Sequence, residues 1–237
     1  MQYGQEHYKR YNAVDVRKYS MHWWANRYYV RVLRGYVPGG RLLEIGCGTG
    51  FFLAELGRYF ETCGIDTSPF ALKHARDNCP RADIRCMRGE DIAGLGPDFF
   101  DAVVSRHVFE HMEEPGTVLE ACYRVLRPGG VLLYVVPNTE SIARRWKGPD
   151  WYGYRDDTHV SLLSPGEWAD LTAAAGFTLE KAYSDGVWDV PYVRYVPNPV
   201  QKCVFGSLGG LQALLSRSFM PLPLGEALII IARKPTR

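Results

Sequence analysis

The feature that most limits what this chain can fold into is a repeated alternation of short apolar runs with helical segments. The runs LLEI, TCGI, DAVVS and VLLYVV lie at residues 42–45, 62–65, 101–105 and 131–136. Short, continuously apolar strands separated by amphipathic helices are typical of βαβ units, in which helices cover both faces of a parallel sheet. The pattern predicts an α/β fold with a doubly wound, mostly parallel sheet.

Local signals mark where helices begin and end. Ser68-Pro69 predicts a helix start, and the RPGG sequence at 127–130 predicts a helix end before a strand. The segment at 164–177 combines a capping serine, a proline and a glutamate three residues after the serine, and a glycine near its end. Beyond it we expect a strand at 178–183, a short helix at 208–216 and a last strand at 226–234.

Charge and composition exclude several classes of protein. The formal net charge is only +2 over 237 residues, and lysine and arginine are scattered, so the basic patch of a nucleic-acid binder is missing. No apolar run approaches the roughly 18 residues that a membrane span needs, and no secretory signal is visible. The six cysteines lack paired spacing, which is typical of reduced thiols. The sequence predicts a cytoplasmic protein without nucleic-acid partners or stable membrane insertion, while peripheral membrane contact and oligomeric state stay open.

A glycine-rich turn follows the first apolar run, in the stretch RLLEIGCGTG at 41–50. A dinucleotide site needs G-x-G-x-x-G and places a pyrophosphate at the helix start. Here the glycines are Gly46, Gly48 and Gly50, so the third comes one residue early, and Glu44 precedes them. A carboxylate at that position would repel a pyrophosphate but suit an ammonium. S-adenosyl-L-methionine carries an ammonium and a sulfonium and no phosphate, so it is the predicted cofactor.

Two further acidic positions follow the next two strands. Asp66 lies 20 residues after Gly46, where a carboxylate can accept from both ribose hydroxyls, although it can also cap the following helix. Glu90 and Asp91 are alternative partners for an adenine amino group, with Ile92 beside them to cover the ring. Three clues on three successive strand ends favour a nucleoside ligand over a turn that merely needs glycine.

The motifs LLEIGCGTG, GIDTSPFALKHAR, GEDI, FFDAVVSRHVFEHM and VLRPGGVLLYVVPN occur in this order within residues 42–176. In this respect the chain resembles the class I S-adenosylmethionine-dependent methyltransferases, in particular small-molecule enzymes of the ubiquinone-biosynthesis O-methyltransferase type. The resemblance implies an enzyme with a Rossmann-like, seven-stranded sheet whose last strand is antiparallel. It also implies that Glu44, Gly46, Gly48, Asp66, Asp91 and the Arg106 backbone line the cofactor. We add their neighbours in the same motifs as predicted cofactor-binding residues: Cys47, Gly50, Thr67, Glu90 and Ile92.

The sequence from His107 to His111 matches H-x-x-E-H, the inverted motif of some zinc peptidases. That motif needs a long helix that carries both histidines on one face, and Pro115 with Gly116 leaves little room for one. It also needs a third ligand. We therefore reject the peptidase interpretation and predict no metal site.

Methyl transfer depends mainly on alignment, but an oxygen acceptor must also lose its proton. Histidine is the natural base near neutral pH. His107, just after the fourth strand, is the first candidate for a catalytic base, and His159 is the second. The alternatives are that His107 only shapes its loop, that His159 only anchors a turn, and that His111 is structural.

We expect a single methyltransferase domain over residues 1–237. Residues 1–37 would form a helical cap, 38–136 the cofactor-binding core, and 137–237 the substrate side and the last strands. Tryptophan and tyrosine concentrate in connections outside the βα repeat, including 146–154 and 188–195, where some rings would pack and others would face the acceptor.

The predicted function is transfer of a methyl group from S-adenosylmethionine to a small-molecule acceptor, most simply at a hydroxyl oxygen. The fourth strand is followed by SRHV rather than an Asn/Asp-Pro-Pro-Tyr run, which disfavours adenine or glutamine nitrogen as the acceptor. Two alternatives stay open: an NAD(P)-dependent oxidoreductase, and a non-catalytic S-adenosylmethionine-binding partner subunit. The sequence does not separate O- from N- or C-methylation of a small molecule.

Overall fold

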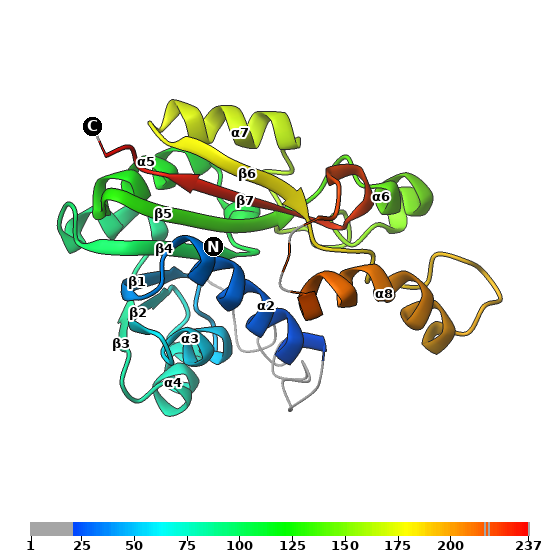
Figure 1. The fold of residues 1–237 in the computed structure, drawn as a ribbon, viewed down its shortest axis with the longest axis horizontal. Coiled ribbons are helices and arrows are strands. Elements are labelled where there is room, and N and C mark those ends of the chain that lie inside the picture. Colours follow the sequence, from blue (N-terminus) through cyan, green and yellow to red (C-terminus); the bar gives the residue numbers. More distant parts are fainter. Residues whose placement is uncertain (1–20, 216, 218, 237) are drawn as a thin grey trace.

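A computed structural model describes residues 21–215, 217 and 219–236 of the chain. Its centre is a seven-stranded sheet in the order β3-β2-β1-β4-β5-β7-β6 (Figure 1). β7 is antiparallel to both neighbours, β5 and β6, and the remaining adjacent pairs are parallel. The strands are β1 (Gly40–Ile45), β2 (Phe60–Asp66), β3 (Asp83–Cys86), β4 (Phe100–Arg106), β5 (Leu126–Pro137), β6 (Thr178–Ser184) and β7 (Ala227–Arg233). The predicted fold class, including the antiparallel last strand, is confirmed.

Helices cover both faces of this sheet (Figure 1). The α-helices are α2 (Met21–Tyr36), α3 (Phe51–Leu56), α4 (Pro69–Asn78), α5 (Pro115–Val125), α6 (Ile142–Lys147), α7 (Pro165–Ala174) and α8 (Asn198–Leu215). The described part of the chain also contains four short 3-10 helices: η1 (Gly89–Leu95), η2 (Phe109–His111), η3 (Gly148–Asp150) and η4 (Leu222–Leu224). Within the described residues, no helix combines the length and the apolarity that crossing a bilayer requires.

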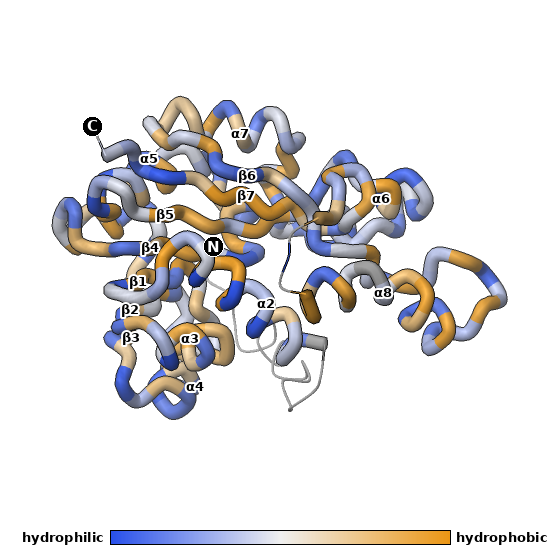
Figure 2. The backbone as a smooth tube through the Cα atoms, in the orientation of Figure 1, coloured by the Kyte–Doolittle hydropathy of each residue, from blue (hydrophilic) through white to orange (hydrophobic). Residues whose placement is uncertain are grey.

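The central strands are apolar on both faces because each face packs against helices. Alternate residues of β5 enter two core clusters: Leu132, Tyr134 and Val136 join the cluster under α5 and α7, and Val131, Leu133 and Val135 join the cluster under α2 and α3. Figure 2 shows apolar residues running along β5 and β7. This two-sided burial explains why the strands read as continuous apolar runs rather than as alternating patterns.

Two predicted helix starts are confirmed by their capping contacts. The Ser68 side chain accepts from Ala71 N at the start of α4, and Ser164 with Glu167 forms a capping box at the start of α7. The predicted helix end is confirmed as well, because α5 ends at Val125, just before RPGG. The strand begins earlier than expected, since RPGG lies inside β5 at a register shift in its pairing with β4. One other prediction was wrong. The short helix expected at 208–216 is the end of the longer α8, which begins at Asn198-Pro199, because a proline is tolerated in the first turn.

The carboxyl ends of the parallel strands meet at one edge of the sheet, and α6 and α8 lie beyond that edge (Figure 1). Ligands of doubly wound sheets bind at such an edge. Since β7 runs in the opposite direction, its first residues and the last residues of β6 lie there too.

Candidate active site

The glycine loop after β1 has a left-handed backbone conformation at three glycines. Gly46, Gly48 and Gly50 have φ angles of +74°, +52° and +84°, which favour glycine. A Cβ at Gly46 would lie 2.3 Å from Val108 Cγ2, and a Cβ at Gly50 would lie 2.9 Å from Cys79 Sγ. The turn itself therefore requires glycine at these two positions, whatever ligand it holds.

We expect Gly46→Ala to lower the free energy of unfolding by about 2 kcal/mol, because the left-handed backbone and the contact with Val108 both oppose a Cβ. Adding Val108→Ala should restore part of the loss by removing the clashing methyl group. Urea denaturation measures both effects. The matched control is Gly166→Ala, where a Cβ would meet nothing closer than 3.9 Å. Equal stability of the Gly46→Ala and Gly166→Ala variants would contradict this account.

Asp66 ties the glycine loop to the start of α4. Its Oδ2 accepts from Gly48 N at 2.9 Å, and its Oδ1 accepts from Ser68 N at 2.9 Å. The side chain is 8% exposed, and the half-buried Thr67 follows it. Asp66 therefore joins the glycine loop to the turn before α4, where Ser68 is the capping residue, and a contact of Asp66 with ribose stays a prediction.

Glu44 is a buried carboxylate beneath this loop. It is 4% exposed, and its Oε2 has no hydrogen-bond partner among the described residues. Burial raises the pKa of Glu44 to about 8, an effect that Arg106 opposes and Asp66 reinforces. Arg106 is itself held elsewhere: it donates to Asn26 Oδ1 at 2.6 Å, and its Nε is buried without a partner among the described residues. An unsatisfied carboxylate fits a cationic ligand and disfavours a pyrophosphate.

The raised pKa of Glu44 predicts how stability depends on pH. An acid whose pKa is about 8 in the folded chain and 4.5 in the reference state holds its proton more tightly when folded. Its contribution to stability therefore falls as pH rises from about 4.5 to 8 and is constant above that window. In the absence of ligand, we expect the melting temperature of wild type relative to Glu44→Gln to fall by several degrees between pH 6 and 8.5.

Thermal unfolding of wild type and Glu44→Gln across this pH range measures the difference in melting temperature. Glu61→Gln, which replaces a glutamate whose side chain is 77% exposed, should leave the wild-type profile unchanged. A melting-temperature difference between wild type and Glu44→Gln that stays constant, or that rises with pH, would contradict the burial argument.

The residues proposed to surround adenine have different environments. Glu90 is held by Arg88 at 3.0 Å, and this hydrogen bond lowers the pKa of Glu90. Asp91 is exposed. Ile92 is fully buried in the core cluster beneath α5, so its side chain packs inward and offers no surface to a ring, contrary to our expectation. Cys47 is also buried, and burial raises the pKa of its thiol.

His107 stands at the end of β4 in an unusual backbone conformation, with φ of +53°. Its N–H donates to Val135 O at 2.8 Å, and its Nδ1 pairs with Oε1 of the fully buried Glu110 at 3.2 Å. The side chain is 31% exposed. A strained, partly exposed histidine oriented by a carboxylate is an arrangement found at functional sites.

His159 lies beside His111, with ring centroids 4.7 Å apart. From the sequence, His159 is a candidate base and His111 is structural. Burial lowers the pKa of His111. The helix η2, which contains His111, is only three residues long. This length excludes the long helix that the inverted peptidase motif requires.

Sequence reasoning missed two acids at the same edge, Asp185 after β6 and Glu226 before β7. Asp185 accepts from Trp188 Nε1 at 2.7 Å, and burial raises its pKa. Glu226 is fully buried, its pKa is raised by burial to about 7, and Tyr152 donates to its carbonyl oxygen at 3.1 Å. The signal was available: an antiparallel last strand places the end of one strand and the start of the next at one edge.

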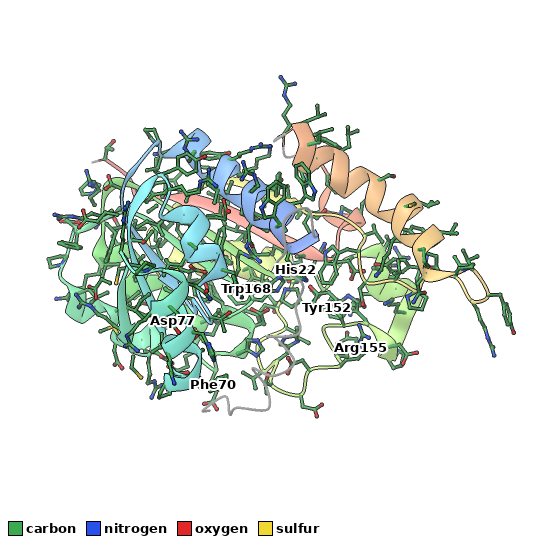
Figure 3. The ribbon with its side chains drawn as sticks, turned by 90° about the horizontal axis from the view of Figure 1, so that it is seen from below. His22, Phe70, Asp77, Tyr152, Arg155 and Trp168 are labelled. Atoms are coloured by element: carbon green, nitrogen blue, oxygen red, sulfur yellow. The ribbon has the colours of Figure 1, made fainter. Side chains whose placement is uncertain are left out.

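The aromatic segments pack largely on one another at this edge. Trp146, Tyr192 and Phe205 have ring centroids between 4.9 and 6.2 Å apart, and Tyr152 stacks on Trp188 at 4.9 Å. In Figure 3, Tyr152 lies on the side where α6 and α8 are found, whereas Phe70 and Asp77 of α4 lie on the opposite side. These ring contacts join α6, the loop after β6 and α8.

The strand order with an inverted last strand, and a glycine loop over a buried carboxylate, agree with the resemblance to the class I S-adenosylmethionine-dependent methyltransferases. A family model described as a methyltransferase domain matches residues 21–182, which is more than half of the chain. The chain belongs to this family. The resemblance expected from the sequence, with S-adenosylmethionine as cofactor, is confirmed.

Curated relatives agree with this assignment. A ubiquinone biosynthesis O-methyltransferase of Xanthomonas campestris is 35% identical over 103 residues, covering 40% of this chain and 42% of the relative. One from Cereibacter sphaeroides is 34% identical over 151 residues, covering 58% and 60%. The chain thus spans about half the length of the curated relatives it matches.

A solved structure supports the fold over nearly the whole chain. A SAM-dependent methyltransferase from Thermotoga maritima superposes with a TM-score of 0.67 and covers 97% of this chain and 95% of its own. Its sequence identity is 21%. A likeness at that identity shows the fold alone.

Proposed function

We propose that this protein transfers a methyl group from S-adenosylmethionine to a hydroxyl oxygen of a small-molecule acceptor. The observation that carries the proposal is the His107–Glu110 pair at the end of β4, where the Nδ1–Oε1 distance is 3.2 Å. A carboxylate that holds Nδ1 leaves Nε2 of the same ring to accept a proton. A base is needed for a hydroxyl, whose proton must leave, more than for a neutral amine.

The residues present fit the cofactor. The unsatisfied Glu44 carboxylate suits the ammonium group, Asp66 suits the ribose hydroxyls, and Glu90 or Asp91 suits the adenine amino group. When bound, S-adenosylmethionine supplies a methyl group on a sulfonium that an acceptor oxygen can attack. The protein's own contribution is to bind and orient both partners.

The surrounding residues would hold the acceptor and exclude water. His107 would accept the hydroxyl proton at Nε2, and Glu110 would keep the ring oriented and stabilise its charged form. Asp185 interacts electrostatically with His107, so a second acidic group besides Glu110 lies near the base. Most of the remaining barrier reduction would come from alignment of the acceptor with the methyl group.

The acceptor atoms named for similar proteins differ. The curated relatives are named O-methyltransferases, whereas the Thermotoga maritima neighbour is described as a possible histamine N-methyltransferase. Several apolar side chains of α8 are exposed, including Val204 at 61% and Leu214 at 63%. These favour a lipid-like or quinone-like acceptor taken up near a membrane surface. In this proposal residues 1–37 act as a cap, 38–136 hold the cofactor and 137–237 enclose the acceptor. Residues 1–20 of the proposed cap lie outside the described residues.

The experiment is label transfer into a metabolite extract. The protein is incubated with S-adenosylmethionine carrying a deuterated methyl group, and products are identified by mass spectrometry and fragmentation. We expect one small molecule with the label on oxygen. Cofactor binding without any labelled product would favour the partner-subunit alternative. A rise in melting temperature with NAD but not with S-adenosylhomocysteine would favour the oxidoreductase.

A further inference from the structure

Arg106, the last residue of β4, has a buried nitrogen without a partner. Its Nη1 donates to Asn26 Oδ1 at 2.6 Å, and its Nε is buried without a hydrogen-bond partner among the described residues. A guanidinium carries a positive charge and five N–H donors. A neutral amide does not balance that charge, and a buried charge without a counter-ion is unfavourable. Arg106 is therefore a candidate for binding an anion.

Glu44 is a buried acid with the complementary deficit. It is 4% exposed, and its Oε2 has no hydrogen-bond partner among the described residues. Glu44 and Arg106 interact electrostatically. Nevertheless, Glu44 Oε2 and Arg106 Nε are both without a partner in the described part of the chain, so the two side chains do not satisfy each other.

Both side chains project from the same face of the sheet. Glu44 pairs in register with Val104, and Arg106 lies two residues further along β4, so the alternation of side chains places all three on one face. Val104 belongs to the core cluster under α2 and α3. The guanidinium carbon of Arg106 lies 4.9 Å from the ring centroid of Tyr29 in α2 and 4.5 Å from that of Phe52 in α3. Since α3 begins directly after the glycine loop, the guanidinium lies near that loop.

A ligand that satisfies both groups needs a negative and a positive charge close together. S-adenosylmethionine ends in an α-amino acid, whose carboxylate and ammonium are bonded to one carbon. A pyrophosphate would suit Arg106 but would be repelled by Glu44, and a simple amine would suit Glu44 but leave Arg106 without an anion. Only a zwitterion of the amino-acid kind matches both.

We propose that the Arg106 side chain binds the carboxylate of S-adenosylmethionine, and that Asn26 is a positioning residue that holds the guanidinium. The sequence assigns only the backbone of Arg106 to the cofactor. Asn26 accepts from Nη1, so the edge formed by Nε and Nη2 presents two parallel donors, the arrangement that pairs with both oxygens of a carboxylate. Because Asn26 and Tyr29 belong to α2, this contact would also link the cofactor to that helix.

Arg27 of α2 is the alternative cation on this side of the sheet. Its Nη1 lies 3.8 Å from Glu55 Oε2, and its guanidinium carbon lies 4.6 Å from the ring centroid of Trp23. Arg27 thus already has an acidic partner, whereas Arg106 has only an amide. This difference makes Arg27→Gln the matched control for Arg106→Gln.

The test compares two ligands that differ only in the carboxylate. S-adenosylhomocysteine has the carboxylate and the ammonium, and S-adenosyl-3-thiopropylamine keeps the ammonium alone. Calorimetry with the full chain at pH 7 measures both Kd values. Wild type should bind S-adenosylhomocysteine about 10- to 100-fold more tightly than the amine. Arg106→Gln should reduce this ratio to within about twofold of unity by weakening S-adenosylhomocysteine alone, and Arg106→Lys and Asn26→Ala should give intermediate ratios.

Arg27→Gln should keep the wild-type ratio. Far-ultraviolet circular dichroism confirms folding of each variant, and the ratio in wild type tests the proposal even if Arg106→Gln fails to fold. Equal affinity of wild type for the two ligands, or a ratio lost in Arg27→Gln and kept in Arg106→Gln, would overturn the proposal. Because no acceptor is present, the assignment does not rest on the proposed function: an intact ratio without methyl transfer in the label experiment would refute that function and leave the role of Arg106 standing.

Discussion

Replacing His107 with asparagine is expected to lower kcat by about 100- to 10,000-fold, the range over which general bases contribute. Asparagine tolerates the left-handed conformation at this position, where φ is +53°, so the loop should keep its shape while the base is lost. The Kd for S-adenosylhomocysteine should stay within about twofold, because His107 is assigned to the acceptor proton and not to the cofactor.

The pH profile of kcat separates a base from a positioning residue. In wild type, kcat should rise with pH as the catalytic base loses its proton and then level off, and the variant should lose that rise. His74→Asn serves as the control for a histidine outside the site. If His107→Asn keeps the wild-type rise in kcat with pH, the proton is taken by another group and the assignment is wrong.

The second large effect concerns Glu44. We expect Glu44→Gln to weaken binding of S-adenosylmethionine by about 10- to 100-fold, as for the loss of one charge-assisted contact. The pKa of Glu44 is raised by burial to about 8, so at pH 7 most of the free protein carries this proton. A bound ammonium favours the ionised carboxylate, and binding should therefore release close to one proton.

Calorimetry in buffers of different ionisation enthalpy measures the number of protons that are released when S-adenosylmethionine binds. Wild type should release that proton at pH 7, and Glu44→Gln should not. 5′-Methylthioadenosine, which has the nucleoside but no ammonium, provides the matched ligand, and its affinity should be similar in both proteins. Equal weakening of both ligands by Glu44→Gln would show that the variant disturbs the loop rather than an ionic contact.

Local chemistry made the conformation of the loop after β1 predictable. The positions of Gly46, Gly50 and Asp66 follow from a strand, a tight turn and a helix start that adjoin in sequence, and the structure shows the close contacts that exclude a Cβ at the two glycines. Ile92 shows the limit of this reasoning. Its apolar character fitted a ring contact and a core contact equally well, and only packing against α5 decided between them.

The acceptor side was less predictable because it is assembled from distant segments. His111 and His159 are 48 residues apart, and no local pattern indicates that their rings lie 4.7 Å from each other. Asp185 and Glu226 converge only because β7 is inserted antiparallel between β5 and β6. The full length of α8 was missed because the glycines and prolines of that region obscured its helical pattern.

The most direct test of the central claim is a crystal structure of the chain with S-adenosylhomocysteine. We predict adenosine at the carboxyl ends of β1, β2 and β3, the ribose hydroxyls on Asp66, and the amino group over the glycine loop within reach of Glu44. A complex in which that edge instead holds the diphosphate of NAD, with S-adenosylhomocysteine failing to bind, would contradict it.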